Sequence, residues 1–209
     1  DAKRYLALTR RDRLAGVLTS IEAAVTAGLD PVKVNAVVMP GVNEVDVVPL
    51  ASYCLGLGAQ LRFIEQMPLG PREQWKRSDM VTAAEIIERL EERFELTPAR
   101  EPRGAAPAAL WNATDRDDPE LSGQLGIIAS VTHPFCGDCD RSRLTSDGTI
   151  RNCLFARSET PLRDLMRSGA SDDELAAVWA GAMWVKKPGH GIDDEGFLQP
   201  DRPMSAIGG

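Results

Sequence analysis

The sequence has few cysteines, a deficit of basic residues and no long apolar run. Four of its 209 residues are cysteine, and no apolar stretch approaches the roughly 20 residues that a membrane-spanning helix needs. No charged-then-apolar leader is present, and 24 basic residues against 31 acidic ones give a net charge of −7. This balance argues against a general nucleic-acid surface. The sequence therefore predicts a cytoplasmic protein with neither a membrane nor a nucleic-acid partner.

Internal repeats are also absent, and the order of the apolar segments indicates the fold. Hydrophobic residues make up 43% of the chain and charged residues 26%, which is typical of a globular protein with a substantial core. Apolar residues recur with helical spacing in 12–28 and 45–57, and strands are expected at 32–39 and 61–67. This α-β-α-β order is typical of parallel strand–helix units in an α/β sheet or barrel.

The second half of the sequence predicts a separate module after an irregular connection. Residues 95–120 form this connection, because they are rich in proline, alanine and charge. Ser171 followed by Glu174 is the pattern of a capping box at the start of a helix. The remaining expected elements are a strand at 125–131, a hairpin at 143–151 that turns at Asp147-Gly148, and helices at 82–94, 161–169 and 172–187.

Three of the four cysteines form one motif. Cys136, Cys139 and Cys153 have the spacing C-x2-C-x13-C, and Arg141 and Arg143 follow the close pair. C-x2-C is a recognised ligand spacing, because a short loop lets both thiolates reach one metal and a return strand brings the third. Cytoplasmic thiols are more often metal ligands than disulfides. The motif therefore predicts a metal site.

Three thiolates admit three interpretations. A closed zinc site needs a fourth ligand, which His133 could supply, whereas three cysteines on a [4Fe–4S] cluster leave one iron open to a ligand. The third interpretation is a metal-free loop, or a disulfide with a spare thiol. The two arginines favour iron–sulfur, because an open iron beside guanidinium groups suits an anionic substrate such as a nucleotide. They could instead neutralise thiolate charge or pair with Asp138 and Asp140.

Polar residues on the two expected strands indicate an anion site. Residues alternate between the faces of a strand, so Lys33 and Asn35 share one face of the first strand, and Arg62 is a charged residue of the second. Parallel strands are usually covered on both faces, where an unpartnered charge is costly. We therefore expect Lys33, Asn35 and Arg62 to face a polar cavity with an anionic occupant. The alternative is that they reach water, or that Glu65 pairs with one of them.

The end of the sequence carries a further feature. Gly208 and Gly209 lack side chains, so they could enter a narrow channel and present a carboxylate to a buried partner. A frayed terminus is the ordinary interpretation, and physics alone favours it. Two other residues are interpreted as structural: Cys54, which lies among apolar neighbours in an expected helix, and His190, which lies beside glycines.

Together these motifs resemble the MoaA family, the radical S-adenosylmethionine GTP cyclases of molybdenum cofactor biosynthesis. The resemblance is carried by the cysteine motif at 133–145, its return cysteine, the strand end at 62–68 and the terminus at 202–209, and it covers nearly the whole chain. Family members also carry an N-terminal C-x3-C-x2-C motif, which this sequence lacks. The resemblance implies that residues 1–97 are the last strand–helix units of an incomplete radical-SAM (β/α) barrel. It implies that residues 98–209 are an α+β module with a second iron–sulfur cluster.

The resemblance implies a role for each matching residue. The three cysteines of the motif would hold a [4Fe–4S] cluster whose open iron binds the guanine base of GTP. The backbone of Met67 would contact S-adenosylmethionine, and Gly208 and Gly209 would reach the active site and assist catalysis. The residues implied in GTP binding are Arg141, Ser142 and Arg143 around the nucleotide, Lys33 at the phosphates, and Arg62 at an anionic group.

The resemblance also implies the reaction and the partners. A second [4Fe–4S] cluster, from the missing N-terminal part, would cleave S-adenosylmethionine to a radical, and GTP would become 3′,8-cyclo-7,8-dihydro-GTP. The enzyme would be a lyase, and this segment alone would be inactive. Its partners would be an electron donor, cyclic pyranopterin monophosphate synthase as the next enzyme, and a second copy in a homodimer. Two alternatives stay open: a zinc-binding interaction module, or the auxiliary-cluster part of a peptide-modifying radical enzyme.

Overall fold

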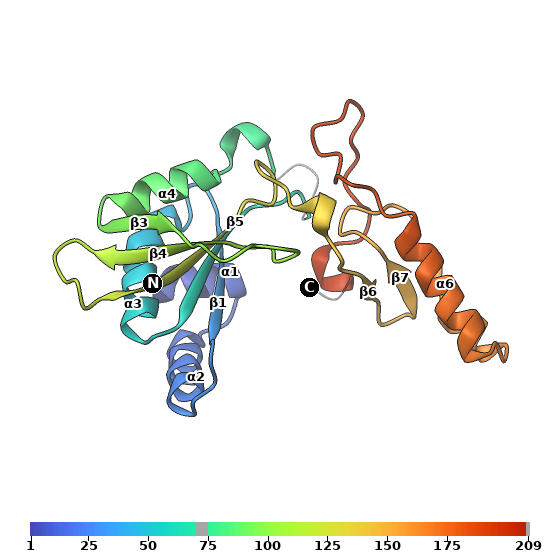
Figure 1. Ribbon diagram of the computed structural model, residues 1–209, viewed down its shortest axis with the longest axis horizontal. Helices are drawn as coiled ribbons and strands as arrows, with labels where there is room; N and C mark the ends of the chain where they lie inside the picture. Colours follow the sequence, from blue (N-terminus) through green and yellow to red (C-terminus); the bar gives the residue numbers. More distant parts are fainter. Residues whose placement is uncertain (70–74, 208–209) are drawn as a thin grey trace. The chain divides into compact units, whose positions relative to one another are not determined.

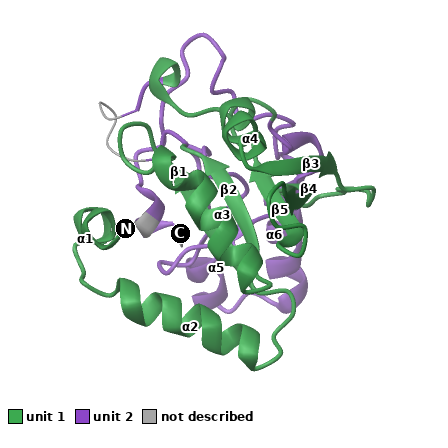
Figure 2. Cartoon of the chain, turned by 90° about the vertical axis from the view of Figure 1, so that its left-hand side faces the viewer, with its two compact units in different colours: residues 1–66, 77–133 green, residues 67–76, 134–209 purple. Residues whose placement is uncertain are grey.

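Figure 1 shows the computed structural model, which describes residues 1–69 and 75–207. The chain forms two compact units, drawn in separate colours in Figure 2. Unit 1 comprises residues 1–66 and 77–133, and unit 2 comprises residues 67–76 and 134–209. The chain therefore passes from one unit to the other three times.

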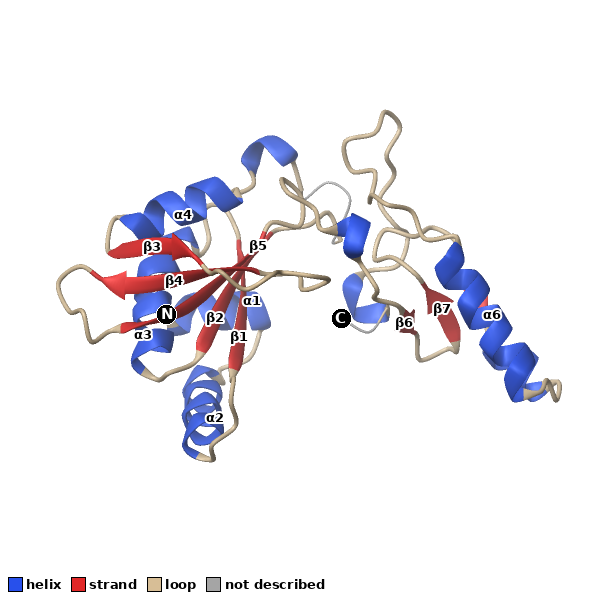
Figure 3. Cartoon of the chain, in the orientation of Figure 1, coloured by secondary structure: helices blue, strands red, loops and turns tan. Residues whose placement is uncertain are grey.

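A five-stranded sheet with the order β1-β2-β5-β4-β3 forms the centre of unit 1 (Figure 3). β1 pairs in parallel with β2, and β2 with β5, which confirms the predicted strand–helix order. β4 is antiparallel to both of its neighbours. The prediction of an irregular connection over 95–120 is wrong, because most of β3 and all of β4 lie there and complete the sheet. The strands are Lys33–Val38 (β1), Gln60–Glu65 (β2), Phe94–Pro98 (β3), Ala109–Asp115 (β4) and Ser122–Ile128 (β5).

Two helices pack on this sheet and bury the core of unit 1. α3 contacts β2 and β5, and α4 contacts β2 and β3. Apolar side chains such as Phe63, Ile86 and Leu125 fill the space between these helices and the sheet, and each is at most 1% exposed. Thr82 and Glu85 form a capping box that fixes the first turn of α4. The helices of unit 1 are Ala2–Thr9 (α1), Leu14–Thr26 (α2), Glu44–Asp46 (η1), Val47–Gly56 (α3), Arg77–Asp79 (η2) and Ala83–Glu91 (α4).

A buried carboxylate connects three elements at one end of this sheet. Glu65 is the last residue of β2 and is fully buried. Its carboxylate accepts hydrogen bonds from the N–H of Ala83 at the start of α4 (2.7 Å) and from the N–H groups of Val131 (2.8 Å) and Thr132 (2.9 Å) beyond β5. The Thr132 hydroxyl donates a fourth, of 2.6 Å. These donors satisfy a charge that would otherwise be costly to bury.

Unit 2 is built from short elements around the sheet β6-β7-β8. β6 and β7 form the predicted hairpin, whose turn places Gly148 at φ +80° and joins its N–H to the Thr145 carbonyl at 2.9 Å. The predicted capping box of Ser171 and Glu174 opens α6. The elements are Cys136–Asp138 (η3), Arg143–Leu144 (β6), Thr149–Arg151 (β7), Thr160–Pro161 (β8), Arg163–Arg167 (α5), Asp172–Trp184 (α6) and Met204–Ala206 (η4).

The units divide the chain at a different point from the predicted domains. The predicted boundary between 97 and 98 falls inside β3, which pairs along its length with β4, and residues 98–133 belong to unit 1. The assignment of 1–97 to a barrel and 98–209 to a cluster module stays a prediction. None of the helices in the described ranges combines the length and apolar character needed to cross a membrane.

Candidate functional site

The cysteine motif lies on loops next to the small sheet of unit 2. Cys136 begins the short helix η3, Cys139 follows its end, and Cys153 follows β7. The N–H of Cys139 donates to the Cys136 carbonyl at 3.3 Å, which closes the C-x2-C turn. All three thiols are partly exposed and none of the four cysteines forms a disulfide, so the disulfide alternative is wrong. Cys54, in contrast, is buried in the core of unit 1, as predicted.

Backbone N–H groups influence the sulfurs of the motif. The N–H of Phe155 donates to Cys153 Sγ at 3.5 Å. The backbone of His190 acts to lower the pKa of Cys136, and that of Arg141 acts to lower the pKa of Cys139. Amide donors of this kind stabilise thiolates and tune iron–sulfur clusters. This donor set fits a cluster held by three cysteines. Within the described residues, however, no three Cys, His, Asp or Glu side chains are gathered closely enough to form a ready metal cage.

The pKa values of Cys136 and Cys139 are shifted by burial and by neighbouring groups. Burial raises the pKa of Cys136, and the neighbouring Cys153 and Cys139 raise it further. Burial alone would also raise the pKa of Cys139, but hydrogen bonds from Arg141 and Lys186 outweigh it, so the net shift is downward. The motif therefore contains one thiol that ionises more readily beside one that resists ionisation.

Lys186 is a site residue that the sequence analysis left without a role. It follows α6, and its ammonium donates to the backbone carbonyls of Arg141 and of Asn152, the second at 2.7 Å. Asn152 also donates from its side chain to the Ala182 carbonyl of α6 at 2.8 Å. The only sequence signal was the Lys186-Lys187 pair before a glycine-rich turn, and lysine pairs are common on solvated surfaces.

The arginines after the motif gather positive charge. Arg141 is exposed and places its guanidinium carbon 4.3 Å from the centre of the Phe135 ring, a cation–π contact. Arg143 begins β6 and is half-buried, as is Ser142. Burial lowers the pKa of Arg143, and the positive charges of Arg141 and Arg151 lower it further. An anionic ligand would reduce the repulsion between such neighbouring positive charges.

The strand residues of unit 1 share a face, as predicted. Asn35 lies beside Arg62 and Lys33 beside Gln60 in the parallel register, while Arg62 also lies beside Gly126 of β5. A Cβ at Gly126 would lie 2.9 Å from Arg62 Cγ, so the missing side chain makes room for the arginine stem. Arg62 Nε donates to Gln60 Oε1 at 3.2 Å.

The surroundings of this face match one of the predicted alternatives and contradict another. Lys33 and Asn35 are exposed on the edge strand β1, so they reach water in this structure. Pairing with Glu65 is wrong, because that carboxylate lies on the opposite face and binds the donors beyond β5 and before α4. The cavity with an anionic occupant stays a prediction.

The remaining predicted residues are scattered over the chain. Met67 is half-buried, and its carbonyl accepts from the Leu69 N–H at 2.8 Å. His133, the candidate fourth zinc ligand, has Nδ1 3.2 Å from the Thr132 hydroxyl. His190 packs edge-to-face against Phe155, with ring centres 5.6 Å apart, in agreement with a structural role. Gly208 and Gly209 lie outside the described residues.

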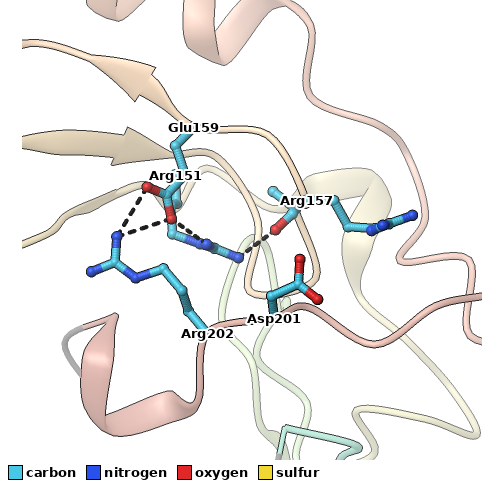
Figure 4. Close-up of a pocket in the computed structure, with 6 residues that line it drawn as sticks. Arg151, Arg157, Glu159, Asp201 and Arg202 are labelled. Carbon is cyan, nitrogen blue, oxygen red and sulfur yellow. Dashed lines mark hydrogen bonds and ion pairs between the residues drawn. The ribbon is translucent and has the colours of Figure 1, made fainter.

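A polar pocket of about 330 Å³ lies beside β7 in unit 2. Figure 4 shows that Arg151 and Arg202 both reach Glu159 there. Arg151 is almost fully buried, and Arg202 also pairs with Asp147 and donates to the Ala206 carbonyl at 2.9 Å. This network fastens the segment before Ile207, which is itself fully buried. No local sequence pattern predicts this network, because Arg202 lies more than forty positions from Asp147 and from Glu159.

Residues 59–192 match the model of a protein family described as Molybdenum Cofactor Synthesis C. The match covers more than half of the chain and includes all three cysteines of the motif. The chain belongs to this family. The family resemblance inferred from the sequence is thereby confirmed.

Three relatives of this chain are named GTP 3′,8-cyclase. A GTP 3′,8-cyclase of Corynebacterium glutamicum is 81% identical over 209 residues, which make up 100% of this chain and 55% of the relative. GTP 3′,8-cyclases of Mycolicibacterium smegmatis and Mycobacterium ulcerans are 54% and 51% identical over the whole chain, which covers 58% of each. The chain thus spans just over half the length of these relatives.

Proposed function

We propose that this chain is the GTP-binding part of a GTP 3′,8-cyclase, a lyase that converts GTP to 3′,8-cyclo-7,8-dihydro-GTP in molybdenum cofactor biosynthesis. The observation that carries the proposal is the cluster of arginines around Arg143, which lies in the chain between the close cysteine pair and Cys153, the three partly exposed cysteines of the motif. Family membership and the common name of the relatives support the same reaction.

In this proposal Cys136, Cys139 and Cys153 hold a [4Fe–4S] cluster. Such a cluster, with three thiolate ligands, offers one iron to a further ligand, here the guanine base. The Phe155 N–H already donates to Cys153, and the backbone of His190 and of Arg141 favours the ionised forms of Cys136 and Cys139, so the polypeptide would compensate part of the charge that the thiolates bring. The chain's own contribution is to hold the nucleotide in one orientation, which is the main requirement of a reaction at a single C–H bond.

The proposed substrate contacts use the residues predicted from the sequence. Arg141, Ser142 and Arg143 bind the nucleotide, because guanidinium and hydroxyl donors suit phosphate and purine acceptors. Lys33 and Arg62 bind phosphate or another anionic group. The backbone of Met67 contacts S-adenosylmethionine, and Gly208 and Gly209 assist catalysis.

The wider setting of the chain is proposed with the same function. Residues 1–97, with β1 and β2, would be the last strand–helix units of an incomplete radical-SAM barrel. A C-x3-C-x2-C motif would hold the second [4Fe–4S] cluster, which would supply the radical chemistry. These 209 residues supply no second set of three cysteine ligands, so we propose that alone they bind GTP without cyclising it. Partners are an electron donor, cyclic pyranopterin monophosphate synthase and a second copy in a homodimer, and the compartment is the cytoplasm.

Metal analysis and nucleotide titration test this proposal. The chain is reconstituted anaerobically with iron and sulfide, its iron and zinc are counted, and GTP binding is measured by calorimetry with ATP as the competitor. Arg141→Ala and Arg143→Ala are each expected to weaken GTP binding about tenfold or more with iron retained, because each loses a charge-assisted hydrogen bond. Arg167→Ala is the matched control, since Arg167 is exposed at the end of α5. Tetrahedral zinc without iron or GTP affinity would contradict the proposal, as would unchanged affinity in both variants.

A further inference from the structure

Lys186 connects two separate segments of the cysteine site to the end of α6. An ammonium group has three N–H donors. One donates to the Arg141 carbonyl before β6 and one to the Asn152 carbonyl after β7 at 2.7 Å. The positive charge of Lys186 also lowers the pKa of Cys139 in the C-x2-C turn. The ammonium is thus held between the segment that follows Cys139 and the segment that precedes Cys153.

The backbone around Lys186 is fixed by the end of α6. The N–H of Lys186 donates to the Met183 carbonyl at 3.1 Å, and Asn152 donates from its side chain to the Ala182 carbonyl of the same helix. A cation near a helix C-terminus is also favoured by the helix dipole. A lysine whose side chain is only solvated at the surface makes none of these contacts. Lys187, the next residue, is exposed and offers the comparison.

The charge of Lys186 lies where negative charge would collect. Three cysteine thiolates bring three negative charges into a partly buried loop, and net charge and hydrogen bonds to sulfur set the reduction potential of a cluster. A fixed positive charge beside one of these sulfurs favours the reduced, more negative state of the cluster. Removing it therefore lowers the reduction potential.

We propose that Lys186 is a positioning residue of the cluster site, which joins the segments of Arg141 and Asn152 and raises the reduction potential of the cluster with its charge. The inference rests on the cluster part of the function proposed above. It assigns a role to a residue outside both the cysteine motif and the arginine pair, and it makes α6 the support of the site.

The test compares three variants of the whole chain after anaerobic reconstitution. Lys186→Met removes the charge and the donors at similar length, Lys186→Arg keeps the charge, and Lys187→Met is the control. Two quantities are measured: the chelator concentration that strips half of the iron, and the cluster reduction potential by redox titration with electron paramagnetic resonance. Circular dichroism of each variant before reconstitution reports whether the fold is intact.

Lys186→Met is expected to lose half of its iron at about tenfold lower chelator concentration, the usual cost of removing an outer-shell partner of a metal ligand. Its reduction potential is expected to shift to more negative values, that of Lys186→Arg to stay close to the wild-type value, and Lys187→Met to match the wild type in both measurements. The shift in potential and its rescue by arginine separate an electrostatic role from a loss of folding.

Several outcomes would overturn the inference. They are an unchanged potential in Lys186→Met, an equal shift in Lys187→Met, and an Arg variant that shifts as far as the Met variant. A wild-type chain that takes up no iron would overturn both the inference and the cluster on which it rests. If iron is bound and the variants behave as expected but GTP does not bind, the inference stands and the proposed substrate is wrong.

Discussion

At the scale of single residues, the buried carboxylate of Glu65 is the group on which most of the local order at one sheet end depends. It accepts four hydrogen bonds from Ala83, Val131 and Thr132, and no solvent replaces them because the residue is fully buried. An unsatisfied buried donor costs more free energy than a hydrogen bond contributes. Loss of this acceptor would therefore destabilise three elements at once.

Glu65→Gln is therefore expected to lower the free energy of unfolding by about 3 kcal/mol, because the new amide turns a donor toward backbone N–H groups and leaves some of them unsatisfied. Urea denaturation measures the change. Glu95→Gln makes the same chemical change at an exposed position of β3 and should have almost no effect. Equal denaturation midpoints for the two variants would show that the carboxylate is not needed.

Sequence reasoning at the residue scale found what alternation and local motifs encode. Strand alternation placed Lys33, Asn35 and Arg62 on one face, and the observed register agrees. The roles of Glu65 and Lys186 were not predictable, because their partners lie 18 to 67 and 34 to 45 positions away in the sequence. Such contacts depend on how the elements pack, and no short pattern contains them.

At the scale of elements, the β6–β7 hairpin places the arginines next to the returning cysteine. Its turn requires Gly148, whose φ of +80° is unfavourable for other residues, and a Cβ there would lie 2.3 Å from the Cβ of Arg163 in α5. Two separate constraints thus act on one glycine. Gly169, after α5, has φ +89° but nothing within 4 Å of its added Cβ, so it carries only the first constraint.

Gly148→Ala is expected to lower the free energy of unfolding by roughly 2 to 4 kcal/mol, the sum of a strained backbone and an overpacked contact. Gly169→Ala should cost only about 1 kcal/mol, from the backbone alone. Thermal unfolding of both variants followed by circular dichroism gives the comparison. If the two substitutions lower the free energy of unfolding equally, the contact with Arg163 does not contribute to the effect of Gly148→Ala.

Element prediction succeeded where the sequence carries its own start and stop signals. The predicted capping box at Ser171 opens a helix in the structure, and the Asp147-Gly148 turn closes a hairpin. β3 and β4 were missed because residues 95–120 are rich in proline, alanine and charge, which disfavour strands locally. Their stability comes from pairing with each other, from pairing of β4 with β5, and from burial of residues such as Phe94 and Ala113 in the core of unit 1.

At the scale of the whole molecule, ion pairs in both units should make the protein sensitive to acid. In unit 1, the Arg93 hydrogen bond and the N–H groups of Asp117 and Asp118 overcome burial and lower the pKa of Asp115. In unit 2, Thr145 and Arg202 lower the pKa of Asp147, and Arg151, Thr149 and Arg202 overcome burial to lower that of Glu159. The sequence reveals the net charge, but not which carboxylates are paired.

The sign of the pH dependence follows from these shifts. A carboxylate with a lowered pKa binds fewer protons in the folded state than in the unfolded one, so it stabilises the fold above its unfolded value of about 4. That contribution is lost as the pH falls through the folded-state pKa. The melting temperature should therefore decrease from about pH 5 downward.

Arg202→Met is expected to reduce this acid dependence, because it removes the cation shared by Asp147 and Glu159 and frees the segment before Ile207 from its ion pairs. The variant should melt at a lower temperature than the wild type near pH 7, and the difference between the two should shrink toward pH 3 as the carboxylates take up protons in both. Arg167→Met, at the exposed end of α5, should keep the wild-type profile. A difference between Arg202→Met and the wild type that stays constant from pH 7 to pH 3 would mean that Arg202 acts through packing and not through its charge.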